Sequence, residues 1–330
     1  MRVVITGGAG FIGTMLATRL LQLGELTVAS GWVEPIDSLV LLDLAHTGPA
    51  PDDPRLQRVT GAVTDAELLR TLVDRPEVCV FHLAAMVSAA CEADFDGALE
   101  TNLDGTRTVL EAVRAQAGRN HRGVPRVVFA SSVAAFGGDA VTSAVSDATK
   151  LTPETTYGMT KAIGELLVND YTRRGYVDGR SARLPTVIIR PGKPNAAASS
   201  WVSGLFREPL HGDEAVLPVG FGTRHPVTGY RTLIDNLVRL SEVDGQDIGV
   251  DRGVNLPALS VTAEQMVGAL KAAAPGRALG PIVHRPDPSI ERIFAGWAQH
   301  SSFDRATRLG LCTDTGLEAI IQQYIEDFLS

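Results

Sequence analysis

A glycine-rich turn near the N-terminus limits the possible folds of this chain more than any other stretch. Residues 2–6 form a short run rich in β-branched side chains, which is typical of a buried strand. Residues 11–23 carry an apolar pattern of helical period, and Gly24 follows it. Between them lies the sequence Gly7-Gly-Ala-Gly10-Phe-Ile-Gly13. Strand, glycine turn and helix in this order predict the first unit of a dinucleotide-binding domain.

The three glycines of the turn have separate physical roles in such a unit. Gly7 permits the tight turn, Gly10 lets backbone N–H groups approach a pyrophosphate, and Gly13 lets the helix pack close to the strand. Phe11 and Ile12, in the same stretch, are included in the predicted cofactor site. The spacing G-x-x-G-x-x-G differs from G-x-G-x-x-G, so a glycine turn without a ligand stays open as an alternative.

Strands and helices are expected to alternate through the first 190 residues. The expected strands after the first are short apolar runs, at residues 38–43, 56–60, 78–83, 126–130 and 184–189. The expected helices cover residues 65–73, 94–117 and 153–173. Residues 26–29 are an alternative second strand, but the run at 38–43 is longer, so 31–37 is assigned to a loop. This alternation predicts an α/β fold with a Rossmann-type doubly wound parallel sheet.

The pattern changes after residue 190. A turn cluster occupies residues 191–195, and the alternation of strands and helices is lost. Helical patterns recur near residues 233–243, 262–274, 290–295 and 317–329, and Thr262 with Gln265 forms a capping-box signature. We therefore predict a dinucleotide-binding domain over residues 1–190. A smaller α/β domain over residues 191–330 would bind the substrate, with some segments packing back on the sheet.

Several residues at predicted strand ends are candidates for cofactor binding, since ligands of such sheets bind there. Asp43 could accept hydrogen bonds from an adenosine ribose and would repel a 2′-phosphate, which favours NAD over NADP; a purely capping role is the alternative. Asp65 is expected to cap its helix and to lie near the adenine. His82 is expected to be a packed residue rather than a catalyst. The remaining candidates are Leu83, Ala84, Ala85, Asn102, Ala130 and Pro191.

A tyrosine and a lysine four positions apart on a predicted helix offer acid–base chemistry. Tyr157 and Lys161 lie on one face of that helix, and an ammonium beside a phenol lowers the phenol's pKa. With 5 tyrosines and four lysines in the chain, an accidental pair is the alternative if the spacing is considered alone. Ser132 ends the fifth predicted strand, twenty-five positions before Tyr157. Together with the glycine turn, these residues indicate a site for proton and hydride transfer.

Composition and charge exclude several classes of protein. The net charge of −8 and the pI near 5.4 argue against a nucleic-acid-binding surface. Apolar runs stop well short of about 18 residues and the N-terminus lacks a signal-peptide core, so we expect a cytoplasmic protein without membrane contact. Three widely spaced cysteines and 7 scattered histidines predict neither a disulfide framework nor a metal site.

Taken together, these motifs resemble the extended short-chain dehydrogenase/reductase family, which includes nucleotide-sugar epimerases and dehydratases. The matching stretches are residues 6–13, 81–85, 102–106, 129–137, 157–161 and 190–192. The resemblance implies that NAD is the cofactor, that Tyr157 is the acid/base and that Ser132 hydrogen-bonds the reacting oxygen. It also implies that Lys161 holds the nicotinamide ribose and lowers the pKa of the tyrosine. Family members often form homodimers through the helices expected here at 94–117 and 153–173.

Other positions indicate which subgroup of the family the chain resembles. Val133 and Ala134 stand where dehydratases of the family carry an acidic pair, and Lys193 stands where epimerases commonly have an asparagine after strand six. Nearly the whole chain, notably residues 82–88 and 183–199, is similar to D-erythronate dehydrogenases, which oxidise a four-carbon sugar acid at C2 with NAD. The segment before Arg231 departs from those relatives.

This resemblance implies a small sugar acid as substrate, and its carboxylate requires a cation. Lys193, between two prolines, is the candidate, with Arg207, Arg231 and Arg224 as alternatives. Ser88 and Ser199 are candidates to hydrogen-bond substrate hydroxyls. Two other functions stay open: a nucleotide-sugar 4-epimerase with bound NAD, and a non-catalytic NAD-binding protein built on the same fold.

Overall fold

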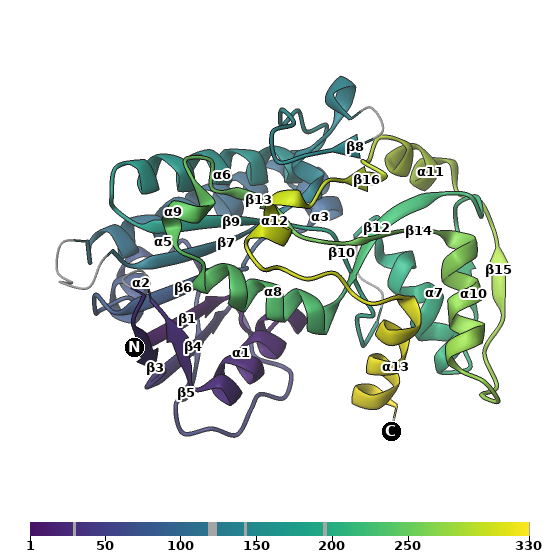
Figure 1. Cartoon of the computed structure of the whole chain (residues 1–330), viewed down its shortest axis with the longest axis horizontal. Helices are drawn as coiled ribbons and strands as arrows, with labels where there is room; N and C mark the ends of the chain where they lie inside the picture. The colour runs from purple at the N-terminus through teal and green to yellow at the C-terminus, as the bar shows by residue number, and fades with distance from the viewer. Residues whose placement is uncertain (29–30, 118–123, 142–143, 194–196, 330) are drawn as a thin grey trace.

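The N-terminal strand lies within a seven-stranded parallel sheet (Figure 1). The computed structural model describes residues 1–28, 31–117, 124–141, 144–193 and 197–329. The strands are β1 (Arg2–Thr6), β4 (Ser38–Asp43), β5 (Leu56–Thr60), β6 (Val78–His82), β7 (Arg126–Ser132), β9 (Asp178–Leu184) and β13 (Gly253–Asn255). Their order is β13-β9-β7-β6-β1-β4-β5. The order reverses between β1 and β6, as in a doubly wound Rossmann-type sheet, and the predicted fold class is confirmed.

Alternate residues of the central strands face two separate cores. Val3 and Ile5 pack against helices α1 (Phe11–Leu23) and α8 (Tyr230–Glu242) on one face of the sheet. Val4 packs on the other face, where the covering helices are α2 (Ala66–Leu72), α5 (Gly105–Arg114) and α6 (Thr156–Arg173). Helices on both faces bury the whole length of the central strands, which explains their continuous apolar sequences.

The sixth strand of the sheet lies earlier in the chain than the sequence predicts. It is β9, Asp178–Leu184, whereas residues 184–189 were expected. The strand contains Asp178, Arg180 and Arg183, all buried, and its lack of an apolar run hid it from the pattern. Arg180 pairs with Asp178 at 3.1 Å, and Arg183 forms an ion pair of its own, so buried charges replace apolar contacts there.

The residues expected to form the sixth strand lie in a different sheet. β10 (Thr186–Ile188) pairs with β12 (Arg224–Gly229), and β12 pairs with β14 (Leu259–Thr262). The chain therefore leaves the main sheet after Leu184, six residues before the predicted end of the first domain. Later segments return to the main sheet: β13 is its edge strand and α8 covers one face.

Two other regions differ from their predicted form. The helix expected over 94–117 consists of α4 (Phe95–Ala98), a π-helical turn (η1, Leu99–Asp104) and α5, and it is preceded by the unpredicted helix α3 (Ser88–Ala93). The loop expected over 31–37 contains β3 (Val33–Pro35), which pairs with β2 (Glu25–Thr27) as a hairpin outside the main sheet. The alternative strand at 26–29 and the turn cluster at 191–195 extend beyond the described residues.

The second lobe stands beyond one end of the main sheet (Figure 1). Its core is formed by α7 (Ser200–Leu210), α10 (Ala263–Ala273) and α13 (Leu317–Phe328) with the β10-β12-β14 sheet. The predicted capping box between Thr262 and Gln265 is present at the start of α10. The remaining elements are the strands β8 (Ala144–Val145), β11 (Ala215–Leu217), β15 (Ile282–His284) and β16 (His300–Ser301), and the helices η2 (Val133–Ala135), η3 (Gly138–Ala140), α9 (Gly245–Ile248), α11 (Pro288–Ala295) and α12 (Asp304–Arg308). Within the described ranges, no helix combines the length and apolar character needed to cross a membrane.

Candidate active site

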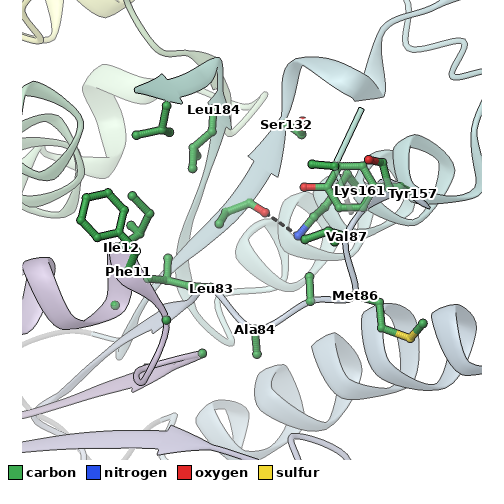
Figure 2. A pocket seen from close by; sticks show the side chains of 18 of the residues that line it. Phe11, Ile12, Leu83, Ala84, Met86, Val87, Ser132, Tyr157, Lys161 and Leu184 are labelled. Atoms are coloured by element: carbon green, nitrogen blue, oxygen red, sulfur yellow. Dashed lines mark hydrogen bonds between the residues drawn. The ribbon is translucent and has the colours of Figure 1, made fainter. Parts of the chain in front are cut away.

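A cavity of about 730 Å³ lies over the carboxyl ends of the main-sheet strands, at the point where the strand order reverses. Both lobes line it. Figure 2 shows Phe11 and Ile12 on one side of the cavity, Tyr157 and Lys161 on the other, and Leu83 and Ala84 between them. The predicted site residues in its lining are Gly7, Gly10, Phe11, Ile12, Gly13, Asp43, Leu83, Ala84, Ala85, Ser88, Ala130, Ser132, Tyr157, Lys161, Lys193, Ser199 and Arg207.

Five candidate site residues do not belong to the lining in the described part of the chain: Asp65, Asn102, Pro191, Arg224 and Arg231. The Asp65 carboxylate caps α2 as predicted, accepting hydrogen bonds from the backbone N–H groups of Glu67 and Leu68. Arg231 binds the carboxylate of Asp327 at 2.6 Å, on the surface of the second lobe. Pro191 lies between two lining residues, Arg190 and Lys193, but outside the lining itself.

The glycine turn leaves room at the start of α1 that side chains would fill. Gly7 has a φ of +71°, and a Cβ atom there would lie 2.8 Å from the backbone nitrogen of Ala84. A Cβ atom at Gly13 would lie 2.5 Å from the carbonyl oxygen of Gly7. The glycine turn therefore packs backbone to backbone against the residues after β6 and against the start of α1. The N-terminus of α1 faces the cavity. This arrangement fits the pyrophosphate of a dinucleotide.

Asp43 fixes the turn and also lines the cavity. One carboxylate oxygen accepts a hydrogen bond of 3.0 Å from the backbone nitrogen of Ala9, and the other accepts one of 2.8 Å from Leu44. The capping role and the ligand-facing role, considered as alternatives from the sequence, are thus compatible. A carboxylate fixed at the end of β4 is suited to the hydroxyls of an adenosine ribose and repels a phosphate at the same place.

Ser132, Tyr157 and Lys161 are brought together by close packing between β7 and α6. The Thr155 hydroxyl caps α6 by accepting a hydrogen bond of 3.0 Å from the Gly158 nitrogen. A Cβ atom at Gly158 would overlap the carbonyl oxygen of Ala134, in the turn that follows Ser132. The first turn of α6 therefore lies directly against the end of β7. Figure 2 shows Ser132, Tyr157 and Lys161 on the same side of the cavity.

Burial determines the electrostatics of this group. Desolvation lowers the pKa of Lys161 to about 8. It also raises the pKa of Tyr157 to about 12, against the lowering effect of a hydrogen bond with Ser132. The sequence predicts a lowered tyrosine pKa, and in the structure the direction is opposite. The reason is burial of the phenol. The Lys161 ammonium lies 5.5 Å from the centroid of the Tyr157 ring and donates a 2.8 Å hydrogen bond to the carbonyl oxygen of Ala130.

Asn102 and His82 are buried side chains that link elements next to the cavity. Within the π-helical turn, the Asn102 side chain accepts a hydrogen bond from the Met86 nitrogen at 2.8 Å and donates one of 3.1 Å to the Thr160 hydroxyl. It therefore ties the loop after β6 to the helix that carries Tyr157. His82 is buried as expected, between two threonine hydroxyls, and burial lowers its pKa to about 3.

The lining also contains residues that sequence reasoning did not select. Arg190, Thr186 and Trp297 line the part of the cavity formed by the second lobe. Thr186 was missed because the sixth strand was placed too late. Since β9 ends at Leu184, the position shortly after strand six is held by Thr186 and not by Lys193, as the sequence suggested. The Thr186 hydroxyl lies 2.6 Å from Nε2 of His225, in the segment before Arg231.

Three comparisons place the chain among known proteins. It is 44% identical to the D-erythronate dehydrogenase of Cupriavidus necator, over 99% of this chain and 98% of the relative. It is 39% identical to the D-erythronate dehydrogenase of Haemophilus influenzae, over 99% of both. The crystal structure of a nucleoside-diphosphate-sugar epimerase from Agrobacterium tumefaciens has a TM-score of 0.90 at 39% identity, covering 100% of this chain and 94% of that one.

More distant structures share the fold. An L-threonine dehydrogenase from Cupriavidus necator has a TM-score of 0.82 at 24% identity, over 99% of both chains. The sequence model of the NAD dependent epimerase/dehydratase family matches residues 3–225. The glycine turn, Asp43 and the cavity above the strand ends suit NAD, the cofactor of that family. On this evidence the chain belongs to the NAD-dependent epimerase/dehydratase family.

Proposed function

We propose that the chain is an NAD-dependent dehydrogenase that oxidises the C2 hydroxyl of D-erythronate to a ketone, giving 2-dehydro-D-erythronate. The main support is similarity to two D-erythronate dehydrogenases along almost the entire length of both chains. The structural observation that carries the proposal is the meeting of Ser132, Tyr157 and Lys161 in one cavity with the glycine turn. A hydroxyl, a phenol and an ammonium beside a dinucleotide site are the groups that alcohol oxidation requires.

Residues of both ends of the cavity would hold the cofactor. The Gly7–Gly13 turn would bind the pyrophosphate, Asp43 the adenosine ribose, and Lys161 the ribose next to the nicotinamide. Asp65 and Asn102 would act from outside the lining, through the α2 cap and the Met86 loop. When bound, NAD⁺ supplies the acceptor for the hydride that leaves C2.

The chemistry of the chain itself is proton transfer. Tyr157, as the phenolate, would take the proton of the C2 hydroxyl, and Ser132 would hydrogen-bond the same oxygen as its charge develops. A positioned general base of this kind contributes about 10²–10⁴ in rate. Lys161 keeps a positive charge near the phenol at pH 7, since burial lowers its pKa only to about 8. That charge favours the phenolate in the reaction complex, against the desolvation that raises the pKa of Tyr157.

Side chains at the second-lobe end would bind the sugar acid. Lys193 and Arg207 line the cavity and are proposed to supply positive charge for the carboxylate, and Ser88 and Ser199 to hydrogen-bond hydroxyls. Arg231 is bound to Asp327 outside the lining, and Arg224 donates to the Ser260 carbonyl. We therefore do not propose Arg231 or Arg224 as the cation that binds the substrate carboxylate.

The test is a panel of four- to six-carbon aldonates with NAD⁺ and NADP⁺, read at the NADH absorbance. D-Erythronate with NAD⁺ should give the highest kcat/KM. Tyr157→Phe should abolish turnover while its Kd for NAD⁺ stays within about threefold of the native value. Near-normal activity in that variant would overturn the proposed role of Tyr157.

A second candidate is a nucleotide-sugar 4-epimerase, favoured by the similarity to the Agrobacterium tumefaciens epimerase. The same panel should include UDP-glucose and UDP-galactose. An epimerase interconverts these sugars without net accumulation of NADH. Flat NADH traces with every aldonate, together with interconversion of the UDP-sugars, would replace the dehydrogenase by the epimerase.

A homodimer and a cytoplasmic location stay predictions. The expected dimer helices include α5 and α6, and Leu166 on α6 is exposed. Light scattering of the native chain and of Leu166→Glu would test the dimer, since a charge in a helix interface should favour the monomer.

A further inference from the structure

We propose that Arg190 binds the carboxylate of the substrate. Arg207 would orient Arg190 and add positive charge to this part of the cavity. The inference rests on the proposed function, because it names the residue that would select a sugar acid over a neutral polyol. The same chemistry would bind the diphosphate of a nucleotide sugar. The experiments below separate these two anions.

The backbone of Arg190 is fixed by two residues of α7 that also line the cavity. The Arg190 nitrogen donates a hydrogen bond of 3.3 Å to the Ser203 hydroxyl. The Arg190 carbonyl oxygen accepts one of 2.8 Å from the Arg207 guanidinium. The Arg190 backbone, just after β10, is therefore held by two hydrogen bonds to α7. The Arg190 side chain extends from this fixed backbone.

The Arg190 side chain is half-buried and without a protein partner in the described part of the chain. It lines the cavity, and no hydrogen bond or ion pair joins its guanidinium to another described residue. The other described arginines that are buried or half-buried all bind a carboxylate or a backbone carbonyl. Arg183, for example, binds Glu165 at 2.7 Å, and Arg252 binds Asp178 at 2.6 Å. Arg190 departs from this pattern at the place where a ligand would bind.

The surroundings of Arg190 hold excess positive charge. Burial, and then the charge of Arg207, lower its pKa from the ordinary value. Arg207 uses its donors on the Arg190 carbonyl and on Glu208, at 2.8 and 2.5 Å. The acids among the described lining residues are Asp43 and Glu100, and both belong to the first lobe. A half-buried guanidinium next to a second one is unfavourable, and an anionic ligand would offset that cost.

Arg190 is better suited to this role than Lys193. Lys193 is exposed, so its ammonium stays hydrated and screened by salt. A guanidinium is less strongly hydrated and offers paired N–H groups that match a carboxylate in bidentate geometry. We therefore assign Lys193 a secondary part in attracting the acid to the cavity.

The first experiment compares acid and neutral substrates in three variants: Arg190→Gln, Arg190→Lys and Arg231→Gln. kcat/KM is measured for D-erythronate and for erythritol, its polyol analogue, with NAD⁺. Arg190→Gln should lower kcat/KM for the acid about 100-fold and leave that for the polyol unchanged, since a charged hydrogen-bonded pair is lost only with the acid. Arg190→Lys should restore part of the loss. Arg231→Gln removes the same charge outside the cavity and should behave as the native chain.

Equal losses for acid and polyol in Arg190→Gln would overturn the proposal, because they would indicate a general disturbance of the site. An unchanged kcat/KM for the acid would overturn it as well. Thermal unfolding of each variant checks that the fold is intact. If Arg190→Gln does not fold, the discrimination between acid and polyol in Arg190→Lys decides the question.

A second measurement separates this inference from the proposed function. D-Erythronate, D-gluconate and UDP-glucose are titrated into the NAD⁺-loaded Tyr157→Phe enzyme by calorimetry, with and without Arg190→Gln. If no aldonate yields NADH with the native chain, the proposed function fails. Loss of affinity for an anion on Arg190→Gln still supports the anion site and identifies which anion it binds. Equal affinities in both proteins, or no binding of any of the three, would overturn it.

Discussion

The ammonium of Lys161 donates a hydrogen bond of 2.8 Å to the carbonyl oxygen of Ala130, at the end of β7. This bond joins the N-terminal half of α6 to β7, the strand that carries Ser132. It holds a positive charge in a buried site, over the rings of Tyr157 and Phe129 at 5.5 and 5.0 Å. The lysine therefore both ties α6 to β7 and places a cation near the Tyr157 ring.

Removing that cation should shift the pH dependence of turnover. Tyr157 must lose its proton to act as a base, so kcat/KM for oxidation should rise with pH as the phenolate forms. In Lys161→Met the rise should move to higher pH by about one unit or more, because the phenolate loses its neighbouring positive charge. The measurement is kcat/KM against pH for both proteins. Superimposable profiles would show that Lys161 acts only through cofactor binding.

The contact between α6 and the end of β7 should be intolerant of a single methyl group. Gly158→Ala places a Cβ atom against the Ala134 carbonyl, so the helix and the turn after Ser132 must separate. A displacement of about 1 Å can cost about 100-fold in rate, and we expect a loss of that order in kcat. The matched control is Gly268→Ala in α10, where the added Cβ meets no heavy atom within 4 Å apart from its chain neighbours and the backbone of its own helix.

Gly268→Ala should leave activity unchanged and raise the free energy of unfolding by about 0.5–1 kcal/mol, because alanine favours a helix over glycine. Both glycines are helical, so the comparison isolates the contact at Gly158. Equal kcat values for the two variants would contradict the proposed close packing.

Local sequence patterns selected many residues that line the cavity. The glycine turn, Asp43, Ser132 and Tyr157–Lys161 are each defined by a strand end or by a spacing within one helix, and all lie in the cavity lining. Most helix and strand positions in the first 175 residues were predicted from the same kind of pattern. These features depend on neighbours in the chain, which is why a sequence reveals them.

The part of the cavity formed by the second lobe depends on contacts between distant segments, which local patterns do not contain. β9 escaped detection since ion pairs of Arg180 and Arg183 replace the apolar side chains of an ordinary buried strand. That error placed Lys193 after strand six instead of Thr186. The acidic partner of Arg231 lies on α13 and the backbone partners of Arg190 lie on α7, so no local pattern contains these contacts. The direction of the Tyr157 pKa shift was missed for the same reason, since burial is a property of the whole fold.

Replacing the carboxylate of Asp43 should relax the choice of cofactor. Asp43→Asn keeps an oxygen that can accept the hydrogen bond of the Ala9 nitrogen, so the glycine turn should stay in place. Loss of the negative charge removes the repulsion of a 2′-phosphate. We expect the ratio of kcat/KM for NADP⁺ to that for NAD⁺ to rise at least about tenfold. Asp213→Asn, which changes an exposed acid of the second lobe outside the lining, is the control. An unchanged ratio in Asp43→Asn would place the adenosine ribose elsewhere.

Two buried histidines should make the fold sensitive to mild acid. His82 lies between the hydroxyls of Thr6 and Thr106, and His225 lies against Thr186. Burial lowers the pKa of each to about 3, against an ordinary value of 6.5. Below pH 6.5 the unfolded chain therefore binds protons that the folded chain does not. Stability is complete above that pH and falls as the pH is lowered.

Each histidine should contribute a slope of about 1.4 kcal/mol per pH unit between pH 6 and 4, in the free energy of unfolding measured with urea. His225→Gln, which retains a partner for the Thr186 hydroxyl, should remove about half of the combined slope. Its stability at pH 7.5 serves as the reference, so that a general loss of packing is separated from a change in proton binding. A slope equal to that of the native chain would mean that His225 is protonated in the folded state.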